Sequence, residues 1–318
     1  MSIIEKAAGK LGETVKPIQP ASDGEKVARD RDEKIIEAAV NREKLGDRVK
    51  SPVSSQPSAE PQSGSTPRLP EQASRHENIN LAKLRQAGMI TPDGERSQIA
   101  EQFRLIKRPL IMNAFNQGAA PVKNGNLIMV TSSFPGEGKS FCSINLAMSI
   151  AMEMDHRVLL VDADVAKPSI PKFFGFKADK GLMDVLLDEH VQLSDVLIRT
   201  NVEKLSILPA GRGHRYATEL LASEAMSRLL RDMAQRYQDR IIIFDSPPLL
   251  STTESRVLAT HMGQIVMIVE AQRTTHEALK EALRQIESCD VVSLLLNKGN
   301  ALTGADYYGY GQYGGYGK

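Results

Sequence analysis

The sequence predicts an α/β fold in which helices cover both faces of a mostly parallel central sheet. Short apolar segments follow one another from residue 127 onward, and amphipathic stretches separate most of them. Strands that are buried on both faces form continuous apolar runs, which is typical of a parallel sheet between two helical layers. The predicted strands are LIMVT (127–131), VLLVD (158–162), LSILP (205–209), IIIFD (241–245), IVMIV (265–269) and VVSLLL (291–296).

A glycine-rich loop follows the first of these strands. Residues 133–140 match G-x-x-x-x-G-K-[ST], except that Ser133 replaces the first glycine. Glycines let backbone N–H groups turn inward around an anion, and the next helix points its positive end at the same place. An ordinary turn between strand and helix is the alternative. The motif predicts a P-loop NTPase fold that binds ATP and Mg²⁺ through Pro135, Gly136, Glu137, Gly138, Lys139, Ser140 and Phe141.

Three aspartates end predicted strands. Asp162 and Asp164 follow the second strand, and Asp245 ends the fourth. Alternate residues of an extended strand share a face, so both members of the first pair can look toward the phosphates. A lone aspartate at a strand end is often only a cap or turn residue. Combined with the loop, the three predict a catalytic set of Lys139, Asp162, Asp164 and Asp245, and a Mg²⁺ site of Ser140, Asp162 and Asp245.

The predicted domain has extensions at both ends. Residues 1–50 are charged and helical in pattern with a short amphipathic start, and residues 51–76 form a linker rich in Ser, Pro and Gln. A helical lead-in follows at 77–125, which we expect to break at Pro92 and to end near Pro109. The P-loop α/β domain spans 126–303. The flexible tail 304–318 carries Tyr307, Tyr308, Tyr310, Tyr313 and Tyr316, separated mostly by glycine.

Composition excludes several classes of protein. The formal net charge of +1 gives no overall attraction to nucleic acid or acidic lipid. The two cysteines have no C-x-x-C spacing, which argues against a disulfide framework and a zinc site. No apolar run approaches the ~18 residues of a membrane span. We therefore expect a soluble protein of a reducing compartment.

The loop, VLLVDADVAKP and IIIFDSPP together resemble the Walker A, A′ and B motifs of bacterial tyrosine kinases, the P-loop kinases of polysaccharide export. The resemblance covers about residues 95–318. AEQFRLIKRPL resembles the family's E-x-x-R-x-x-R oligomerisation helix, and the tyrosine-rich end resembles its autophosphorylation cluster. Asn297 resembles its adenine-edge residue, with a strand-end cap as the alternative. The oligomerisation residues implied are Glu101, Arg104, Lys107 and Arg108.

The resemblance implies an ATP-dependent protein-tyrosine autokinase that phosphorylates the five tail tyrosines in trans within a homo-oligomeric ring. Asp164 would be the base, although the sequence alone does not separate it from Asp162. The implied partners are an inner-membrane activator of the polysaccharide co-polymerase type and a tyrosine phosphatase, with no nucleic acid. The implied location is cytoplasmic, peripheral to the inner membrane through that partner. The segments MSIIEKA and FRLIKRPLI look most like the soluble type associated with exosortase systems.

Two departures and three alternatives accompany this prediction. Ala166 stands where the family often has arginine, and Lys107 replaces an arginine, which loses bidentate geometry. One alternative is a switch ATPase of the ParA and MinD kind that binds a membrane partner without kinase activity, but Phe134 occupies the position of its signature lysine. A scaffold with a degenerate site is another. The tail could also be a low-complexity segment that stacks on single-stranded nucleic acid.

Overall fold

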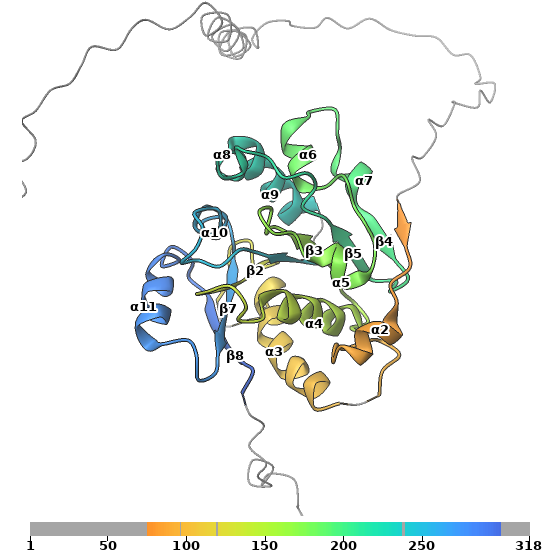
Figure 1. Cartoon of the computed structure of the whole chain (residues 1–318), viewed down its shortest axis with the longest axis vertical. Coiled ribbons are helices and arrows are strands. Elements are labelled where there is room, and N and C mark those ends of the chain that lie inside the picture. The colour runs from red at the N-terminus through yellow and green to blue at the C-terminus, as the bar shows by residue number, and fades with distance from the viewer. Residues whose placement is uncertain (1–74, 96, 119, 237–238, 300–318) are drawn as a thin grey trace, which may run out of the picture. The chain divides into compact units, whose positions relative to one another are not determined.

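The computed structural model describes residues 75–299, apart from residues 96, 119, 237 and 238, and contains one eight-stranded sheet with helices on both faces (Figure 1). The strands are β1 (His76–Glu77), β2 (Leu127–Ser132), β3 (Arg157–Asp162), β4 (Ile198–Thr200), β5 (Leu205–Leu208), β6 (Arg240–Asp245), β7 (Gln264–Glu270) and β8 (Val292–Asn297). The helices are α2 (Leu81–Gln86), α3 (Gln98–Ala114), α4 (Lys139–Ala151), α5 (Ile170–Phe174), α6 (Leu182–Leu187), α7 (Leu193–Val196), α8 (Ala217–Leu221), α9 (Glu224–Arg236), α10 (Glu254–Ala259) and α11 (His276–Arg284).

The sheet confirms the predicted class. Its order is β1-β4-β5-β3-β6-β2-β7-β8, and every adjacent pair is parallel except β4 with β5. The six predicted strands correspond to β2, β3, β5, β6, β7 and β8. The sequence missed β1 and β4, because strands of two and three residues are too short to show an apolar period.

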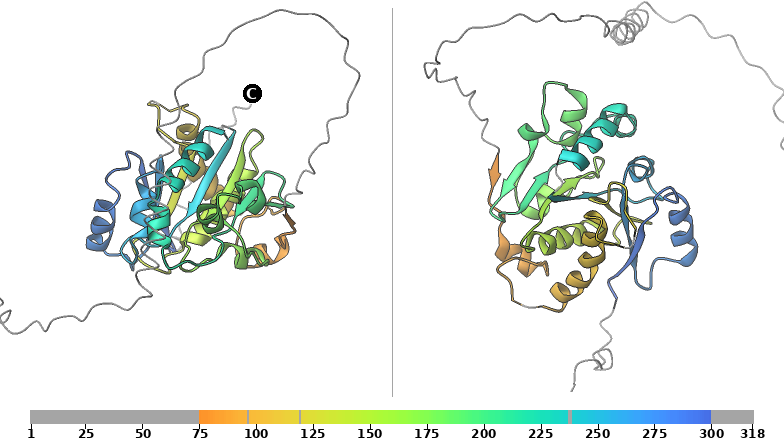
Figure 2. Two further views of the ribbon diagram at one scale, coloured as in Figure 1. Left: turned by 90° about the horizontal axis from the view of Figure 1, so that it is seen from above. Right: turned by 180° about the vertical axis from the view of Figure 1, so that it is seen from behind.

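Two hydrophobic clusters form the core, one on each face of the sheet. Successive strand residues point to opposite faces, so Ile128 and Val130 join one cluster while Leu127 and Met129 join the other. Helices α2, α3, α4 and α5 pack on the first face, and α6 to α11 pack on the second. In the rear view of Figure 2, α2 to α4 and α8 to α9 lie on opposite sides of the sheet. This double covering explains why the central strands are apolar throughout.

The sequence predicted that the helix would end near Pro109, and this prediction is wrong for α3. It runs to Ala114 with the proline inside it. Leu110 and Ile111 are buried in the core, and this burial outweighs the one hydrogen bond that proline removes. The carbonyl that loses its helical donor belongs to Leu105, four residues earlier, and this residue is 77% exposed.

The lead-in belongs to the same core as the sheet. Ile79, Leu84 and Phe103 are buried in the cluster that α4 shares. His76, which the sequence assigned to the linker, lies in β1 and pairs with Arg199 of β4. Within the described residues, no helix combines the length and apolar character needed to cross a membrane.

Candidate functional site

The glycine-rich loop lies where the motif predicts it, between β2 and the first residue of α4. Gly136 and Gly138 adopt left-handed conformations, with φ of 87° and 100°. A Cβ at position 138 would lie 2.1 Å from the side-chain nitrogen of Asn297. Both glycines are therefore required for the shape of the loop, and the start of α4 faces the space that the loop encloses.

Glu137 shapes the loop from the inside. Its side chain is 1% exposed. One carboxylate oxygen accepts the backbone N–H of Phe134 at 2.8 Å, and the other accepts the hydroxyl of Thr274. The sequence placed this residue in the phosphate cradle, but its carboxylate points into the protein and leaves only its backbone for a ligand.

The end of β8 supports the outer side of the loop. The Asn297 amide donates to the Glu137 carbonyl at 2.9 Å. The Lys298 ammonium donates to the Gly136 carbonyl at 2.7 Å and pairs with Glu270 at 3.1 Å. The Asn297 amide thus supports the loop itself, and its contact with an adenine edge stays a prediction.

Asp162 and Asp245 lie side by side at the carboxyl edge of the sheet, where they are partners in the β3–β6 register. Asp162 Oδ2 accepts the backbone N–H groups of Ser169 and Ile170, both at 2.9 Å. Asp245 Oδ1 accepts the Ser143 hydroxyl at 3.0 Å. The second oxygen of each carboxylate is buried and has no hydrogen-bond partner among the described residues.

Burial raises the free energy of ionising both carboxylates, and therefore their pKa values. It raises the pKa of Asp162 to about 7, and the neighbouring Asp245 adds to the shift. Burial also raises the pKa of Asp245 to about 6, although Lys139 and nearby serine hydroxyls oppose it. A cation beside the two unpaired oxygens would remove this cost, so the residues fit Mg²⁺.

The protein alone does not supply a complete metal site. No three acidic, histidine or cysteine side chains of the described residues form a cluster that could hold a metal ion. The Ser140 hydroxyl lies close by and accepts a hydrogen bond from the Ser169 hydroxyl at 3.0 Å. Such a cation would therefore take ligands from Asp245, Asp162, Ser140 and the nucleotide together, as P-loop proteins generally arrange it.

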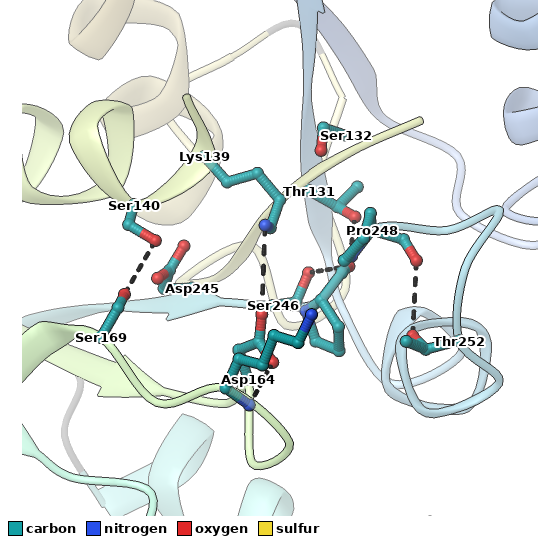
Figure 3. Close-up of polar contacts among 12 residues, drawn as sticks. Thr131, Ser132, Lys139, Ser140, Asp164, Ser169, Asp245, Ser246, Pro248 and Thr252 are labelled. Atoms are coloured by element: carbon teal, nitrogen blue, oxygen red, sulfur yellow. Dashed lines mark hydrogen bonds and ion pairs between the residues drawn. The ribbon is translucent and has the colours of Figure 1, made fainter. Parts of the chain in front are cut away.

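Asp164 faces the Lys139 ammonium, unlike Asp162, which lies beside Asp245. Its Oδ2 lies 4.0 Å from the Lys139 ammonium, and its Oδ1 accepts the Lys167 N–H at 3.0 Å. Figure 3 shows the lysine extending from the start of α4 toward this carboxylate, away from the Ser140–Ser169 contact. Burial raises the pKa of Asp164, while Lys139 lowers it. Asp164 is thus the partly open carboxylate of the three.

The remaining predicted ligands lie around the mouth of the loop. Pro135 is exposed. Phe134 precedes it, was not among the predicted ligands, and is 42% exposed. Phe141 lines a cavity of about 480 Å³ between α3, β8 and the start of α4, and Asn297 lines the same cavity.

The predicted oligomerisation residues divide into two groups. Glu101 and Arg104 form a surface ion pair at 2.7 Å, and Arg108 is exposed. Lys107 is buried, donates to the Ser149 carbonyl at 2.6 Å and pairs with Glu153 at 2.7 Å. The resemblance grouped Lys107 with the ring residues, but in this structure its ammonium points toward the end of α4, where Ser149 and Glu153 hold it.

Sequence reasoning missed four residues that hold the site together. Ser143 and Ser169 contact the buried carboxylates, while Thr274 and Lys298 hold the loop. Ser143 carried a signal, since it lies one turn beyond Lys139 on the same helix. The five tail tyrosines lie outside the described residues.

Comparison with known proteins places this site in a family. A family model described as an AAA domain matches residues 125–298. The tyrosine-protein kinase ptk of Acinetobacter johnsonii is 31% identical over 225 residues, which cover 71% of this chain and 29% of ptk. The tyrosine-protein kinase YwqD of Bacillus subtilis (strain 168) is 29% identical over 233 residues, which cover 73% of this chain and 94% of YwqD.

A solved structure agrees with these relatives. The crystal structure of the VpsO kinase domain is similar with a TM-score of 0.51 and 29% identity, covering 64% of this chain and 100% of that domain. The chain spans only 25% to 29% of the length of three curated relatives, ptk among them. The chain belongs to the AAA domain family, and its loop and carboxylates are those of a P-loop protein. Over this region it is similar to bacterial tyrosine kinases.

Proposed function

We propose that the protein is an ATP-dependent protein-tyrosine autokinase that phosphorylates its own C-terminal tyrosines and regulates exopolysaccharide polymerisation or export. The observation that carries the proposal is that the three aspartates differ in burial and in the groups they contact. Two are buried with one oxygen each left without a partner, and the third lies 4.0 Å from the P-loop lysine. Kinase relatives over 71% and 73% of the chain support it.

The chain's own residues would hold the nucleotide. The backbone N–H groups of residues 136–140 and the start of α4 would surround the β and γ phosphates, and Lys139 would neutralise part of their charge. Asp162, Asp245 and Ser140 would hold Mg²⁺, which supplies positive charge to the γ-phosphoryl oxygens. These fixed charges lower the barrier mainly by positioning and electrostatics.

Asp164 would accept the proton of the attacking tyrosine. A phenol has a pKa of about 10 and is a poor nucleophile at neutral pH until a base takes its proton. The tyrosine oxygen forms a bond to the γ phosphorus, the bond from that phosphorus to the β–γ bridging oxygen breaks, and ADP leaves. The proton passes to Asp164. The raised pKa of this carboxyl, caused by burial, brings it nearer to the working pH of a base.

The finer assignments extend this proposal. We infer phosphorylation in trans within a ring that uses the surface pair Glu101 and Arg104 together with Arg108. From the family resemblance we infer two partners, an inner-membrane activator of the polysaccharide co-polymerase type and a tyrosine phosphatase. The resemblance also supports a cytoplasmic location peripheral to that membrane and membership of the exosortase-associated type. Lys107 is left out of the ring contact, because its own chain holds it.

The experiment incubates the purified full chain with ATP and Mg²⁺ and maps phosphate on the C-terminal peptide by mass spectrometry. Phosphate is expected on tyrosines between 307 and 316, and Lys139→Met should abolish it. Lys280→Met is the matched control, because that lysine is exposed on α11. ATP hydrolysis with an unmodified tail, even after addition of the candidate membrane partner, would contradict the kinase and favour a switch ATPase.

A further inference from the structure

The loop between β5 and α8 carries a cationic and aromatic surface that the proposed mechanism does not use. Its sequence is Gly211-Arg-Gly-His-Arg-Tyr216. Arg212, Arg215 and Tyr216 are exposed, Tyr216 by 49%. No carboxylate of the described residues forms an ion pair with either arginine. Two guanidinium groups therefore face solvent with their charge available to a ligand.

The base of this loop is fixed. The carbonyls of Pro209 and Ala210 accept the N–H groups of Leu182 and Met183 at 2.8 and 3.0 Å. Gly211 has a φ of 82°, and a Cβ there would lie 2.4 Å from Asp184 Oδ2. The turn therefore has a defined direction, and the charged residues follow it directly.

The tip of the loop is organised around one ring. The Arg215 guanidinium lies over the Tyr216 ring, 4.6 Å from its centroid. The His214 ring lies 5.7 Å from it, and the backbone N–H of Tyr216 donates to His214 Nδ1 at 3.3 Å. An aromatic face with an adjacent guanidinium suits a ligand that is itself aromatic and anionic.

The loop emerges beside the candidate base. Strand β5 is the neighbour of β3, with Leu208 in register with Val161, so the loops after both strands leave the same edge of the sheet. Two residues beyond Tyr216, the Thr218 hydroxyl donates to Glu254 at 2.9 Å. Glu254 begins α10, and its carboxylate lies close enough to Asp164 to help raise the pKa of that carboxyl.

We propose that Arg212, Arg215 and Tyr216 form a binding site for phosphotyrosine in the tail of this protein, which holds an already phosphorylated tyrosine while another tyrosine of the same tail enters beside Asp164. The inference rests on the proposed kinase function. The occupant follows from charge: residues 304–318 contain one aspartate and one lysine, and each phosphate adds about −1.5 to −2. The unmodified tail has little negative charge to attract the arginines. A phosphotyrosine in the tail provides phosphate oxygens that a guanidinium can bind in bidentate fashion, together with an aromatic ring.

The test measures binding of two fluorescent peptides of residues 304–318, one unmodified and one phosphorylated at Tyr310, to the full chain without ATP. The protein is dephosphorylated first, so its own tail is the same competitor in every sample. The phosphorylated peptide should bind roughly fivefold to tenfold more tightly, as one or two partly exposed charged contacts allow. Equal binding of the two peptides by the unaltered chain would overturn the proposal.

Variants locate the site. Arg212→Gln/Arg215→Gln should bind both peptides equally, and Arg212→Lys/Arg215→Lys should recover part of the difference. Lys280→Gln/Arg284→Gln removes the same charge from the exposed face of α11 and should behave as the unaltered chain. Discrimination that persists in the Gln variant, with an unchanged unfolding midpoint, would contradict the site. The measurement has no catalytic step, so its failure leaves the kinase proposal standing, and a failed kinase assay leaves this result interpretable.

Discussion

The two sides of the P-loop are built differently. On the β7–β8 side, the described polar groups are paired: Glu137 with Thr274, the loop carbonyls with Asn297 and Lys298, and Lys298 with Glu270. On the β3–β6 side, two buried carboxylates each retain an oxygen without a described partner. Buried polar groups are normally satisfied, so an unsatisfied pair indicates a place for a ligand. One side maintains the shape of the loop and the other is left for binding.

The largest effect is expected from Asp164→Asn on the binding side. Removing a positioned base should slow phosphoryl transfer by about 10²- to 10⁴-fold. Nucleotide affinity should change little, because the amide keeps the size of the carboxylate. Single-turnover phosphorylation of the tail and binding of a fluorescent ATP analogue would measure the two quantities. A variant of unchanged rate would exclude Asp164 as the base and leave Asp162 as the candidate.

The pH dependence of stability should come mainly from the same side. Asp162 and Asp245 have pKa values raised from 3.8 to about 7 and about 6 in the folded protein. Between the unfolded-state and folded-state pKa values, the folded protein binds more protons than the unfolded chain. The free energy of unfolding therefore falls as the pH rises from 4 to about 7. Without nucleotide and Mg²⁺, the loss should be of the order of a few kcal/mol.

Thermal unfolding between pH 5 and pH 8 checks this expectation. An ATP analogue with Mg²⁺ should flatten the profile, because bound cation replaces the protons. Asp162→Asn should also flatten it, whereas Asp290→Asn, an exposed control, should leave it unchanged. A profile that rises with pH in the ligand-free protein would show that the buried carboxylates are stabilised by contacts other than those described.

On the shape-maintaining side, Glu137→Ala should destabilise the protein. It leaves the Phe134 N–H and the Thr274 hydroxyl without their acceptor, at a cost of about 1–3 kcal/mol. Glu137→Gln keeps one acceptor oxygen and should lose less. Urea unfolding gives the stability, and nucleotide affinity should fall in parallel. If Glu137→Ala lost affinity with no loss of stability, the carboxylate would be acting on the ligand directly.

The smallest effects belong to the end of β8. Asn297→Ala removes one hydrogen bond to the loop and should cost about 1 kcal/mol. Lys298→Met should cost less than Asn297→Ala, because that side chain is 46% exposed and water screens both its contact with the Gly136 carbonyl and its ion pair with Glu270. Urea unfolding measures both. A larger loss of nucleotide affinity than of stability in Asn297→Ala would support the adenine-edge role that the resemblance implied.

The sequence by itself determined the fold class and the binding side of the loop. The apolar strands, both glycines, Lys139 and the three strand-end aspartates are local patterns, and in a parallel sheet the carboxyl ends of neighbouring strands meet at one edge. Register then placed Asp162 beside Asp245, as the prediction required. No long-range contact had to be known in advance for this part of the site.

Only the tertiary structure decided the shape-maintaining side. Glu137 and Thr274 are 137 residues apart, and Lys298 is 162 residues from Gly136, so no local period links them. The inward direction of the Lys107 side chain likewise depends on Glu153, which belongs to a different segment. Helix α3 continues through Pro109 because Leu110 and Ile111 become buried in the core. Local patterns specify which groups a strand or loop presents, whereas packing between distant segments determines which of those groups remain free to bind.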